Sequence, residues 1–453
     1  MPRRSQLLVL FGLPCLLAVA ACDDTELPAG PPPSCVGKSG CITTILGTGK
    51  AAQGPEGVDG WRSPIYSPQD QTVGPDGKLY YIDWNNHRIR VWDPATQKTS
   101  TVAGTGELGD IGHGGKALKA RLNHPTALTF DPLGRLVISA WHNSRIKRVD
   151  LKTALLEDIC GTGARAFDGD GVVGGAKKAK LDLPSSLVFD SQGNVFLSDQ
   201  ANQRIRKVDA QDTISTVVGD VWLTDTGAAA GTPLQDAEGN YLGCDKAPFA
   251  SKDKVSLEKK SNGASGPVLD EKGKEVAYTG PIPAPDLCGG FSGDGGLAKA
   301  ARISSPKSQA ASPAGRLFVD KGDNLYIADT ANHRIRKVDA KTGVISTIAG
   351  VGTFGAAGDG GEATAAQLNN PTDVDMLPDG GLLIADKENH CIRVVRDGKI
   401  ATFAGICGKR GFAGDGGAAK AAKLDRPYGI HVDGGGTVYI ADTHNHRIRI
   451  VTP

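Results

Sequence analysis

The chain has 453 residues, among them 51 Lys and Arg, 50 Asp and Glu, and 61 glycines, with a formal net charge of +1. This balance, with no basic stripe along the chain, argues against nucleic acid as a partner. One apolar run, at the N-terminus, leaves no other candidate for insertion into a membrane, and the high glycine content is typical of short strands joined by tight turns.

Residues 1–21 are predicted to form a secretory signal peptide. Two arginines precede an apolar run from Leu7 to Ala21, which is too short to span a bilayer. The run ends in Val-Ala-Ala-Cys22, which resembles the lipobox of bacterial lipoproteins, where the cysteine sulfur receives a diacylglycerol and becomes the new N-terminus. We therefore expect lipidation at Cys22 and a tether over residues 22–40. Ordinary cleavage that leaves Cys22 as a plain thiol is the alternative.

These features predict an exported protein, held by its N-terminal lipid at the periplasmic face or the surface of a bacterial envelope. The sequence does not distinguish the inner from the outer membrane.

A ten-residue motif that occurs six times organises the rest of the chain. One copy is Asp329-Thr-Ala-Asn-His-Arg-Ile-Arg-Lys-Val338. Successive copies lie 56 to 59 residues apart, except the third and fourth, which are 130 apart. A fixed period of this size indicates stacked copies of one small unit, and the excess predicts an insertion, residues 220–289, between units three and four.

Each unit is predicted to be a four-stranded meander. In the fourth unit the strands are expected at 317–319, 325–328, 334–338 and 345–348, with turns between them. Six such sheets around an axis make an all-β, six-bladed β-propeller over residues 41–453.

Closure of the ring is predicted as well. The chain stops at Pro453, directly after the third strand of the last blade, and Ile42-Thr-Thr-Ile-Leu-Gly47 matches the fourth-strand sequence Ile345-Ser-Thr-Ile-Ala-Gly350. We expect this N-terminal strand to complete the last blade and remove its open edge.

Several of these segments resemble the NHL repeat: Pro371-Thr-Asp-Val374, Leu383-Ile-Ala-Asp386, Asn389-His-Cys-Ile392 and the linker Phe291-Ser-Gly-Asp-Gly-Gly296. The resemblance covers residues 42 to 453 apart from the insertion. It implies a six-bladed propeller, in agreement with the count of units. It also implies a range of functions, from binding platforms to a few lyases and hydrolases that use the channel mouth, so the fold alone does not assign one.

Seven cysteines remain once the signal peptide and Cys22 are set aside, and export favours disulfides. The odd number leaves at least one cysteine unpaired within the chain, and sequence cannot prove connectivity. The pairs that we consider are Cys35–Cys41, Cys244–Cys288 and Cys391–Cys407.

Two families of repeated charged residues are interpreted as structural. Aspartates that end second strands are expected to accept turn amides or to pair with arginines that start third strands. Ala140 in blade two and Cys391 in blade five depart from this pattern. Aspartates in the Gly-Asp-Gly-Gly linkers are expected to cap turn amides rather than bind calcium. The residues are Asp83, Asp199, Asp329, Asp386 and Asp442; Arg88, Arg145, Arg204, Arg334 and Arg447; and Asp110, Asp170, Asp294, Asp359 and Asp415, with Asp59 as a degenerate copy.

The strongest candidate site lies on the innermost strands. Asp70, Asp373, Asp375 and His431 come from blades one, five and six, which are neighbours in a closed ring. We expect them to gather at the channel mouth as an acid–base cluster or a divalent-metal site, with a hydrated lining that has no function as the alternative. No other cofactor is indicated, and neither Gly-x-Ser-x-Gly nor His-Glu-x-x-His occurs.

Three functions are weighed. The favoured one is a lipid-anchored binding or scaffold protein, expected to be a monomer, that presents its insertion-bearing face to a protein, peptide or glycan. The second is a metal-assisted lyase or hydrolase that uses Asp373, Asp375 and His431. The third is a structural domain that docks into an envelope complex. The insertion serves as a lid or partner-binding arm in the first case and is a tolerated loop otherwise.

Overall fold

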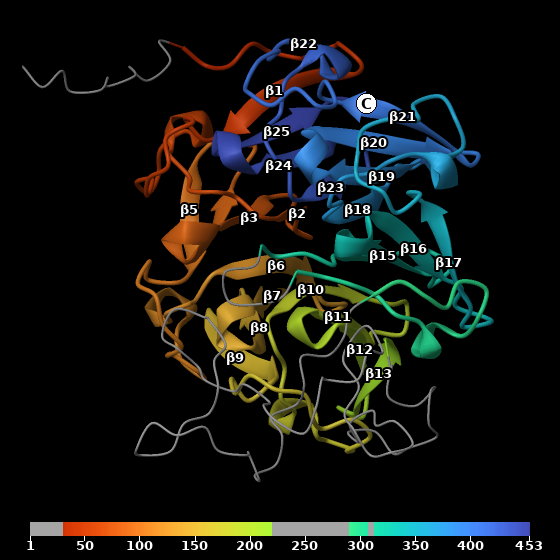
Figure 1. Ribbon diagram of the computed structural model, residues 1–453. Coiled ribbons are helices and arrows are strands. Elements are labelled where there is room, and N and C mark those ends of the chain that lie inside the picture. Colours follow the sequence, from red (N-terminus) through yellow and green to blue (C-terminus); the bar gives the residue numbers. More distant parts are fainter. Residues whose placement is uncertain (1–29, 220–289, 307–311) are drawn as a thin grey trace, which may run out of the picture.

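The computed structural model describes residues 30–219, 290–306 and 312–453 (Figure 1). The signal peptide 1–21, Cys22, the first part of the tether (residues 22–29) and the insertion 220–289 with Cys244 and Cys288 lie outside these residues, so the statements about them stay predictions. Within the described ranges, none of the helices has the length and apolar character needed to cross a bilayer.

Six antiparallel sheets form a closed ring, as predicted, and the innermost strand of each lies at the centre (Figure 1). Blade one contains β2 (Gln71–Val73), β3 (Leu79–Asp83), β4 (Arg88–Trp92) and β5 (Thr99–Ala103); blade two contains β6 (Pro125–Phe130), β7 (Leu136–Ala140), β8 (Arg145–Asp150) and β9 (Leu155–Cys160); blade three contains β10 (Pro184–Phe189), β11 (Val195–Asp199), β12 (Arg204–Val208) and β13 (Ile214–Val218).

The second half of the ring repeats this order. Blade four contains β14 (Leu317–Val319), β15 (Leu325–Asp329), β16 (Arg334–Val338) and β17 (Ile345–Ala349); blade five contains β18 (Asp373–Met376), β19 (Leu382–Asp386), β20 (Cys391–Arg396) and β21 (Lys399–Ala404); blade six contains β23 (Ile430–Val432), β24 (Val438–Asp442) and β25 (Arg447–Val451), completed by β1 (Cys41–Leu46) and edged by β22 (Gly417–Ala418).

Short 3₁₀ turns recur at two places in every unit. Those between second and third strands are η2 (Trp84–Asn86), η4 (Trp141–Asn143), η6 (Gln200–Asn202), η8 (Thr330–Asn332), η10 (Lys387–Asn389) and η12 (Thr443–Asn445). Those in the linkers are η1 (Gly60–Arg62), η3 (Ala117–Lys119), η5 (Ala176–Lys178), η7 (Ala298–Ala300), η9 (Ala363–Ala365) and η11 (Ala419–Ala421).

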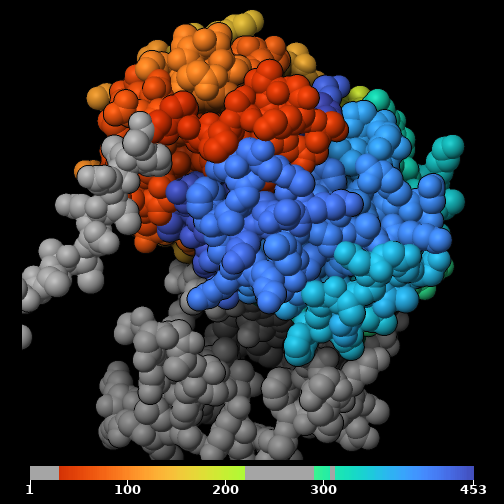
Figure 2. Space-filling view, turned by 90° about the horizontal axis from the view of Figure 1, so that it is seen from above, coloured from red at the N-terminus to blue at the C-terminus, as the bar shows by residue number. Residues whose placement is uncertain are grey.

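The ring closes through its N-terminal strand, as the sequence predicts. β1 pairs antiparallel with β25, with Ile42 opposite Val451, and β22 covers its other side. Figure 2 shows the red N-terminal segment packed directly against the blue C-terminal blade. The predicted Cys35–Cys41 disulfide holds the start of this strand.

The core lies between neighbouring blades rather than inside any one of them. Tyr80 and Ile82 of blade one pack with Leu136 and Ile138 of blade two, and equivalent clusters join the other pairs. Because each sheet is covered on both faces, its second strand is mostly apolar, apart from Ser139 and Ser198 and the aspartates at the strand ends. Cys160 lies in one of these clusters and is the free cysteine of the described residues.

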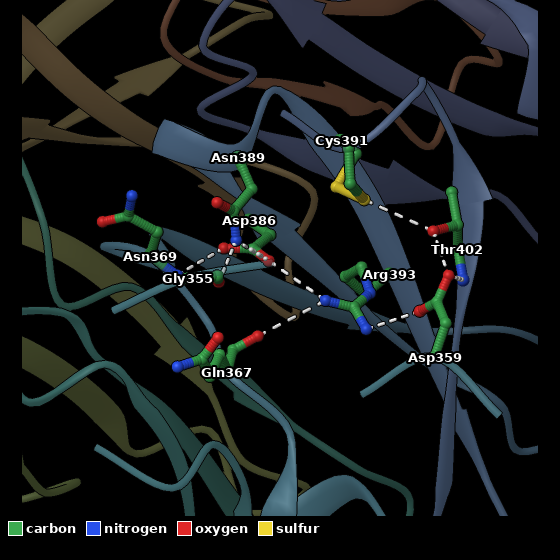
Figure 3. The surroundings of a disulfide bond; sticks show 10 residues. Gly355, Asp359, Gln367, Asn369, Asp386, Asn389, Cys391, Arg393 and Thr402 are labelled. Atoms are coloured by element: carbon green, nitrogen blue, oxygen red, sulfur yellow. Dashed lines mark hydrogen bonds and ion pairs between the residues drawn. A yellow bond between two sulfur atoms is a disulfide. The ribbon is translucent and has the colours of Figure 1, made fainter. Parts of the chain in front are cut away.

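A buried arginine clasps each regular blade (Figure 3). In blade five, Asp386 accepts hydrogen bonds from the backbone N–H of Asn369 and from Asn389 Nδ2, both at 2.7 Å. Arg393 lies 3.5 Å from Asp386 Oδ2 and 2.5 Å from Asp359 Oδ1. The arrangement recurs as Asp199–Arg206–Asp170, Asp329–Arg336–Asp294 and Asp442–Arg449–Asp415.

The prediction of a clasp is confirmed, but its arginine was misassigned. The arginine two residues after the start of the third strand reaches the carboxylates. Both arginines lie on the same face of the strand, and the second one is placed between the aspartate that ends the second strand and the linker aspartate. In blade four the arginine at the start bonds elsewhere: Arg334 donates to the carbonyl of Val351 at 2.7 Å, and its guanidinium lies 3.7 Å from the ring centroid of Phe291. Arg447 lies over Phe412 in the same way. In blade two, by contrast, Arg145 at this position pairs with Asp110 and Asp158.

The irregular blades compensate with other residues. In blade one, Glu56 takes the linker position, accepting from Thr101 at 2.7 Å beside Arg90, whereas Asp59 pairs with Lys98. The prediction that Asp59 is the blade-one equivalent of the linker aspartates was therefore wrong, because Glu56 takes that position.

Blade two, which has Ala140 in place of aspartate, gains a carboxylate elsewhere. Buried Lys147 lies 2.9 Å from both Asp110 and Asp158, and Asp158 occupies the place of the fourth-strand threonine. In blade five, Cys391 replaces the arginine and forms the predicted disulfide with Cys407.

The repeated histidine joins neighbouring units. The backbone N–H of Asn370 donates to His333 Nδ1 at 3.1 Å, and His87, His390 and His446 accept equivalent bonds. Blade three has Gln203 instead, whose Oε1 accepts from the backbone N–H of Ser305 at 2.7 Å. Five blades thus supply an acceptor at this position, whereas blade two has Ser144, whose buried hydroxyl has no hydrogen-bond partner among the described residues.

We expect His333→Gln to leave the stability at pH 7 unchanged, because glutamine supplies that acceptor in blade three, and His333→Leu to cost about 1 kcal/mol through the unpaired N–H. Chemical denaturation checks both. Burial lowers the pKa of His333, so its contribution is present above the unfolded pKa of about 6.5 and is lost as the pH falls. His333→Gln should not lose that contribution at pH 5, and an equal loss in both proteins would contradict this role.

Candidate functional site

Two layers of residues face the channel axis, and each blade contributes one residue to each layer, from its innermost strand or from the position directly before that strand. Register with the second strands fixes the members: Ala127 lies opposite Ser139, Ser186 opposite Ser198 and Asp373 opposite Ala385. The first layer is Asp70, Ala127, Ser186, Arg316, Asp373 and Gly429; the second is Thr72, Thr129, Val188, Phe318, Asp375 and His431.

Arg316 crosses the first layer from blade four to the opposite side of the ring. Its Nη1 lies 2.5 Å from Asp70 Oδ1 and 3.4 Å from Asp373 Oδ2. Its Nη2 donates to the carbonyls of Gln69 at 2.9 Å and Thr126 at 2.5 Å. The buried guanidinium therefore ties four blades together at the axis.

The carboxylates of the first layer also join neighbouring blades. Asp70 Oδ2 accepts the backbone N–H of Leu128 at 2.9 Å, and Asp373 Oδ2 accepts that of Ile430 at 2.8 Å. The Ser186 hydroxyl accepts the backbone N–H of Leu317 at 3.1 Å and so joins blade three to blade four. This layer is thus largely structural, since its polar atoms satisfy backbone amides that the innermost strands leave unpaired.

The second layer brings Asp375 and His431 together, as the sequence predicts. Asp375 Oδ2 accepts the backbone N–H of Val432 at 2.7 Å and lies 3.8 Å from His431 Nδ1. The imidazole keeps 23% of its side-chain surface exposed, against 12% for the carboxylate. Of the four candidate residues, these two form an accessible pair, whereas Asp70 and Asp373 lie deeper against Arg316.

A cavity of about 350 Å³ occupies the channel above Arg316, lined by all six innermost strands. It is closed where these strands begin, because Gln69, Thr126, Ser185, Thr372 and Tyr428 are buried there. It extends instead to Phe130, Phe189, Val319 and Val432, where the strands end. By strand direction, Gly219 and Gly290, which flank the insertion, lie on the closed face. The candidate site and the insertion's attachment points are therefore on opposite faces.

Burial shapes the electrostatics of the pocket. It raises the pKa of Asp375 to about 7, and Asp70 adds to this while the backbone N–H groups of Met376 and Val432 oppose it. Burial lowers the pKa of His431 to about 4. At neutral pH the pair therefore consists of a neutral imidazole and a carboxyl group poised between its two protonation states.

The pKa of Asp373 is raised to about 8, mainly by burial and only partly offset by Arg316. Because the unfolded carboxyl titrates near 3.8, the folded protein binds the extra proton between these values, and its stability falls as the pH rises. Between pH 5 and 8 this carboxyl should lower the free energy of unfolding by at most about 1.4 kcal/mol for each pH unit. Asp373→Asn should remove that dependence on pH. Thermal unfolding at each pH measures it, and parallel curves for the two proteins would contradict the assignment.

The channel residues do not fit the divalent-metal site considered from the sequence. Arg316 already supplies the cation between Asp70 and Asp373. In the described part of the chain, no group of three or more His, Cys, Asp or Glu side chains is arranged to hold a metal ion.

Sequence reasoning missed Arg316. In the other blades a proline lies two residues before the channel position, but in blade four it is Pro313, three residues before it. Alignment on the second strand, where Arg316 pairs with Ala328, would have placed the arginine in the same layer as Asp70 and Asp373.

The comparisons with known proteins agree with this architecture. Residues 39–235 match the teneurin NHL domain, and residues 368–395 and 424–451 match the NHL repeat. Teneurin-1 of Homo sapiens is 24% identical over 91% of this chain and 13% of its own length. NHL repeat-containing protein 2 of Gallus gallus is 26% identical over 84% of this chain and 54% of its own length. The chain thus spans less than two thirds of these relatives.

Among solved structures, an auxiliary nutrient binding protein from Bacteroides thetaiotaomicron superposes with a TM-score of 0.55 at 14% identity, over 90% of this chain and 75% of that one. This likeness concerns the fold. The repeat matches, together with the closed ring of six sheets, show that the chain is an NHL-repeat β-propeller protein.

Proposed function

We propose that the chain is a binding protein of the bacterial cell envelope, anchored by lipid at Cys22, which takes a small glycan unit into the channel pocket. The observation that carries the proposal is the Asp375–His431 pair, which lies at an accessible level of a cavity of about 350 Å³. That volume is within the range of pockets that bind small ligands and is too small for a folded partner.

The chemistry of the second layer suits a hydroxyl-rich ligand. Asp375 offers carboxylate acceptors, while Thr72 and Thr129 offer hydroxyls that both donate and accept. The neutral His431 adds one donor and one acceptor, and Phe318 presents an apolar ring to the same cavity. A sugar ring has an apolar face and several hydroxyls at its edge, so it can use both kinds of contact at once.

An envelope location is supported by independent features. Cys35–Cys41 and Cys391–Cys407 are disulfides, which persist in exported proteins. The lipobox-like sequence before Cys22 provides the anchor. The shared fold of a bacterial nutrient binding protein adds support for a binding role. Cys22→Ser should move the protein from the membrane fraction to the soluble fraction; continued membrane association would refute the anchor.

The binding test uses the soluble full chain carrying Cys22→Ser. Neutral oligosaccharides of glucose, galactose, mannose and N-acetylglucosamine are titrated by calorimetry. His431→Val and Asp375→Thr should weaken the best binder at least about tenfold, because each removes polar contacts from a buried site. Valine and threonine already occupy this layer in blades one to three, so both variants should fold.

Val188→Thr is the matched control, since it changes the same layer in blade three and leaves the pair intact. Binding that is unaffected by His431→Val and Asp375→Thr, or absent for the whole panel, would overturn the glycan assignment.

A lyase or hydrolase is the second candidate, favoured by one observation: the pKa of Asp375 is raised to about 7, beside an imidazole that stays neutral. Such a carboxyl group can donate or accept a proton at the working pH. Turnover of a bound oligosaccharide that disappears in Asp375→Thr would establish catalysis, and binding without turnover would establish the first function alone.

A further inference from the structure

A second cluster of polar side chains lies on the opposite face of the ring, between blades one and two. His124 ends the linker into β6, and His142 lies in η4. Their Nδ1 atoms are 3.0 Å apart, and Asn123 Oδ1 lies 2.8 Å from His124 Nδ1. Both imidazoles are partly exposed. His124 Nδ1 therefore lies within hydrogen-bond distance of both other atoms, and each of the three atoms can offer a lone pair to an ion once the ring nitrogens that face one another carry no proton.

The separations match the bite of a metal ion. With metal–nitrogen bonds of about 2.0–2.1 Å, two nitrogens 3.0 Å apart subtend an angle of roughly 95° at the metal. The shorter nitrogen–oxygen separation also gives an angle close to 90°. Angles of this size belong to square-planar or octahedral coordination rather than tetrahedral coordination, and nitrogen and oxygen donors in that geometry favour Cu²⁺ or Ni²⁺.

The surrounding side chains hold the imidazoles in place before any ion binds. Trp84 packs against His124 with ring centroids 4.7 Å apart, and Trp141 stacks on His142 at 4.2 Å. The backbone N–H of His124 donates to His87 Nδ1.

The repeat itself does not require these residues. At the position of His142, blades three and four have Ala201 and Ala331 and blade six has His444. At the position of His124, blades one and five have Ser67 and Asn370. Within the described residues, blade two alone places a histidine at both positions, so the pair is an addition to the structural pattern.

We propose that His124, His142 and Asn123 form a binding site for a divalent transition-metal ion, with Cu²⁺ bound most tightly. Copper(II) stands highest among the divalent first-row metals in affinity for such donors. The site is distinct from the channel pocket, which opens on the other face, so either can be present without the other.

The test titrates Cu²⁺ into the untagged, chelator-treated full chain carrying Cys22→Ser. Calorimetry with glycine as competitor gives the affinity, and electron paramagnetic resonance gives the ligand set. We expect one Cu²⁺ with two imidazole nitrogens in its plane. His142→Ala should weaken binding at least about tenfold and remove one nitrogen coupling, because it deletes one of two imidazole ligands.

His444→Ala is the matched control, since it makes the same substitution at the same repeat position in blade six and should bind Cu²⁺ like the parent. Alanine occurs at this position in two blades, so neither variant should disturb the fold. Equal binding by the two variants, or a parent spectrum without imidazole coupling, would overturn the proposal.

Discussion

Deletion of residues 35–50 should abolish the cooperative unfolding transition of the propeller. The deletion removes β1, in which Ile42 and Leu46 are fully buried, and each such side chain contributes about 1.5–3 kcal/mol. It also removes the Cys35–Cys41 disulfide and exposes the edge of β25. Because domains are stable by only about 5–15 kcal/mol in total, the combined loss is comparable with the whole free energy of unfolding.

Circular dichroism during heating measures this effect. Ile42→Glu should reproduce most of it, since it places a charge in the same cluster. Val36→Glu is the control, because Val36 is 90% exposed and should tolerate the charge. A truncated chain with the melting temperature of the intact protein would show that the last blade does not depend on β1.

Arg393→Met should destabilise the protein by about 3–5 kcal/mol, as expected when one partner of a buried ion pair is removed. Arg393 is fully buried and links Asp386, at the end of β19, to Asp359 in the linker (Figure 3). The variant leaves Asp386 buried without its guanidinium. An arginine occupies the equivalent position in three other blades, so the result also indicates how much each of those ion pairs contributes to the stability of the ring.

Arg396→Met, three residues along the same strand, is the matched control for the clasp. Its guanidinium is 44% exposed and pairs with the exposed Asp379, so its loss should cost no more than about 1 kcal/mol. Urea denaturation of the two variants gives the comparison. Equal costs would mean that the buried clasp contributes no more than a surface pair.

The sequence predicts the architecture well because the fold is a sum of similar units. The constant spacing of the motif, with one interval of 130 residues, yields six blades and one insertion. The match between the segments after Ile42 and Ile345 yields the closure through β1. Two of the three proposed disulfides are present among the described residues; the third, Cys244–Cys288, lies outside them.

The clasp and the channel are harder to predict, because both depend on contacts between blades. Arg334 and Arg336 look alike in sequence and both lie over Phe291, yet Arg336 joins Asp329 to Asp294 whereas Arg334 donates to the carbonyl of Val351. Both side chains lie on the same face of β16, so their different partners depend on how far along the strand each one lies relative to the linker. Arg316 was missed for a related reason: it reaches Asp70 across the ring, and no local pattern reports a contact between opposite blades.

The candidate site was predicted in part. Asp375 and His431 occupy neighbouring innermost strands and meet, as expected. The sequence did not show that the first layer is closed by Arg316, or that the pocket therefore opens away from the attachment points of the insertion. Both facts follow from strand direction and from the burial of Gln69 and Thr126, which become known only when the ring is assembled.

The central claim is that the ligand occupies the channel pocket between Asp375 and His431. A crystal structure of the soluble full chain with the best-binding oligosaccharide tests it most directly. We predict a sugar ring in the pocket that contacts Asp375, His431 and Phe318. A sugar bound on the other face, beside η2 and η4, or on the outer rim of the blades, would contradict the account.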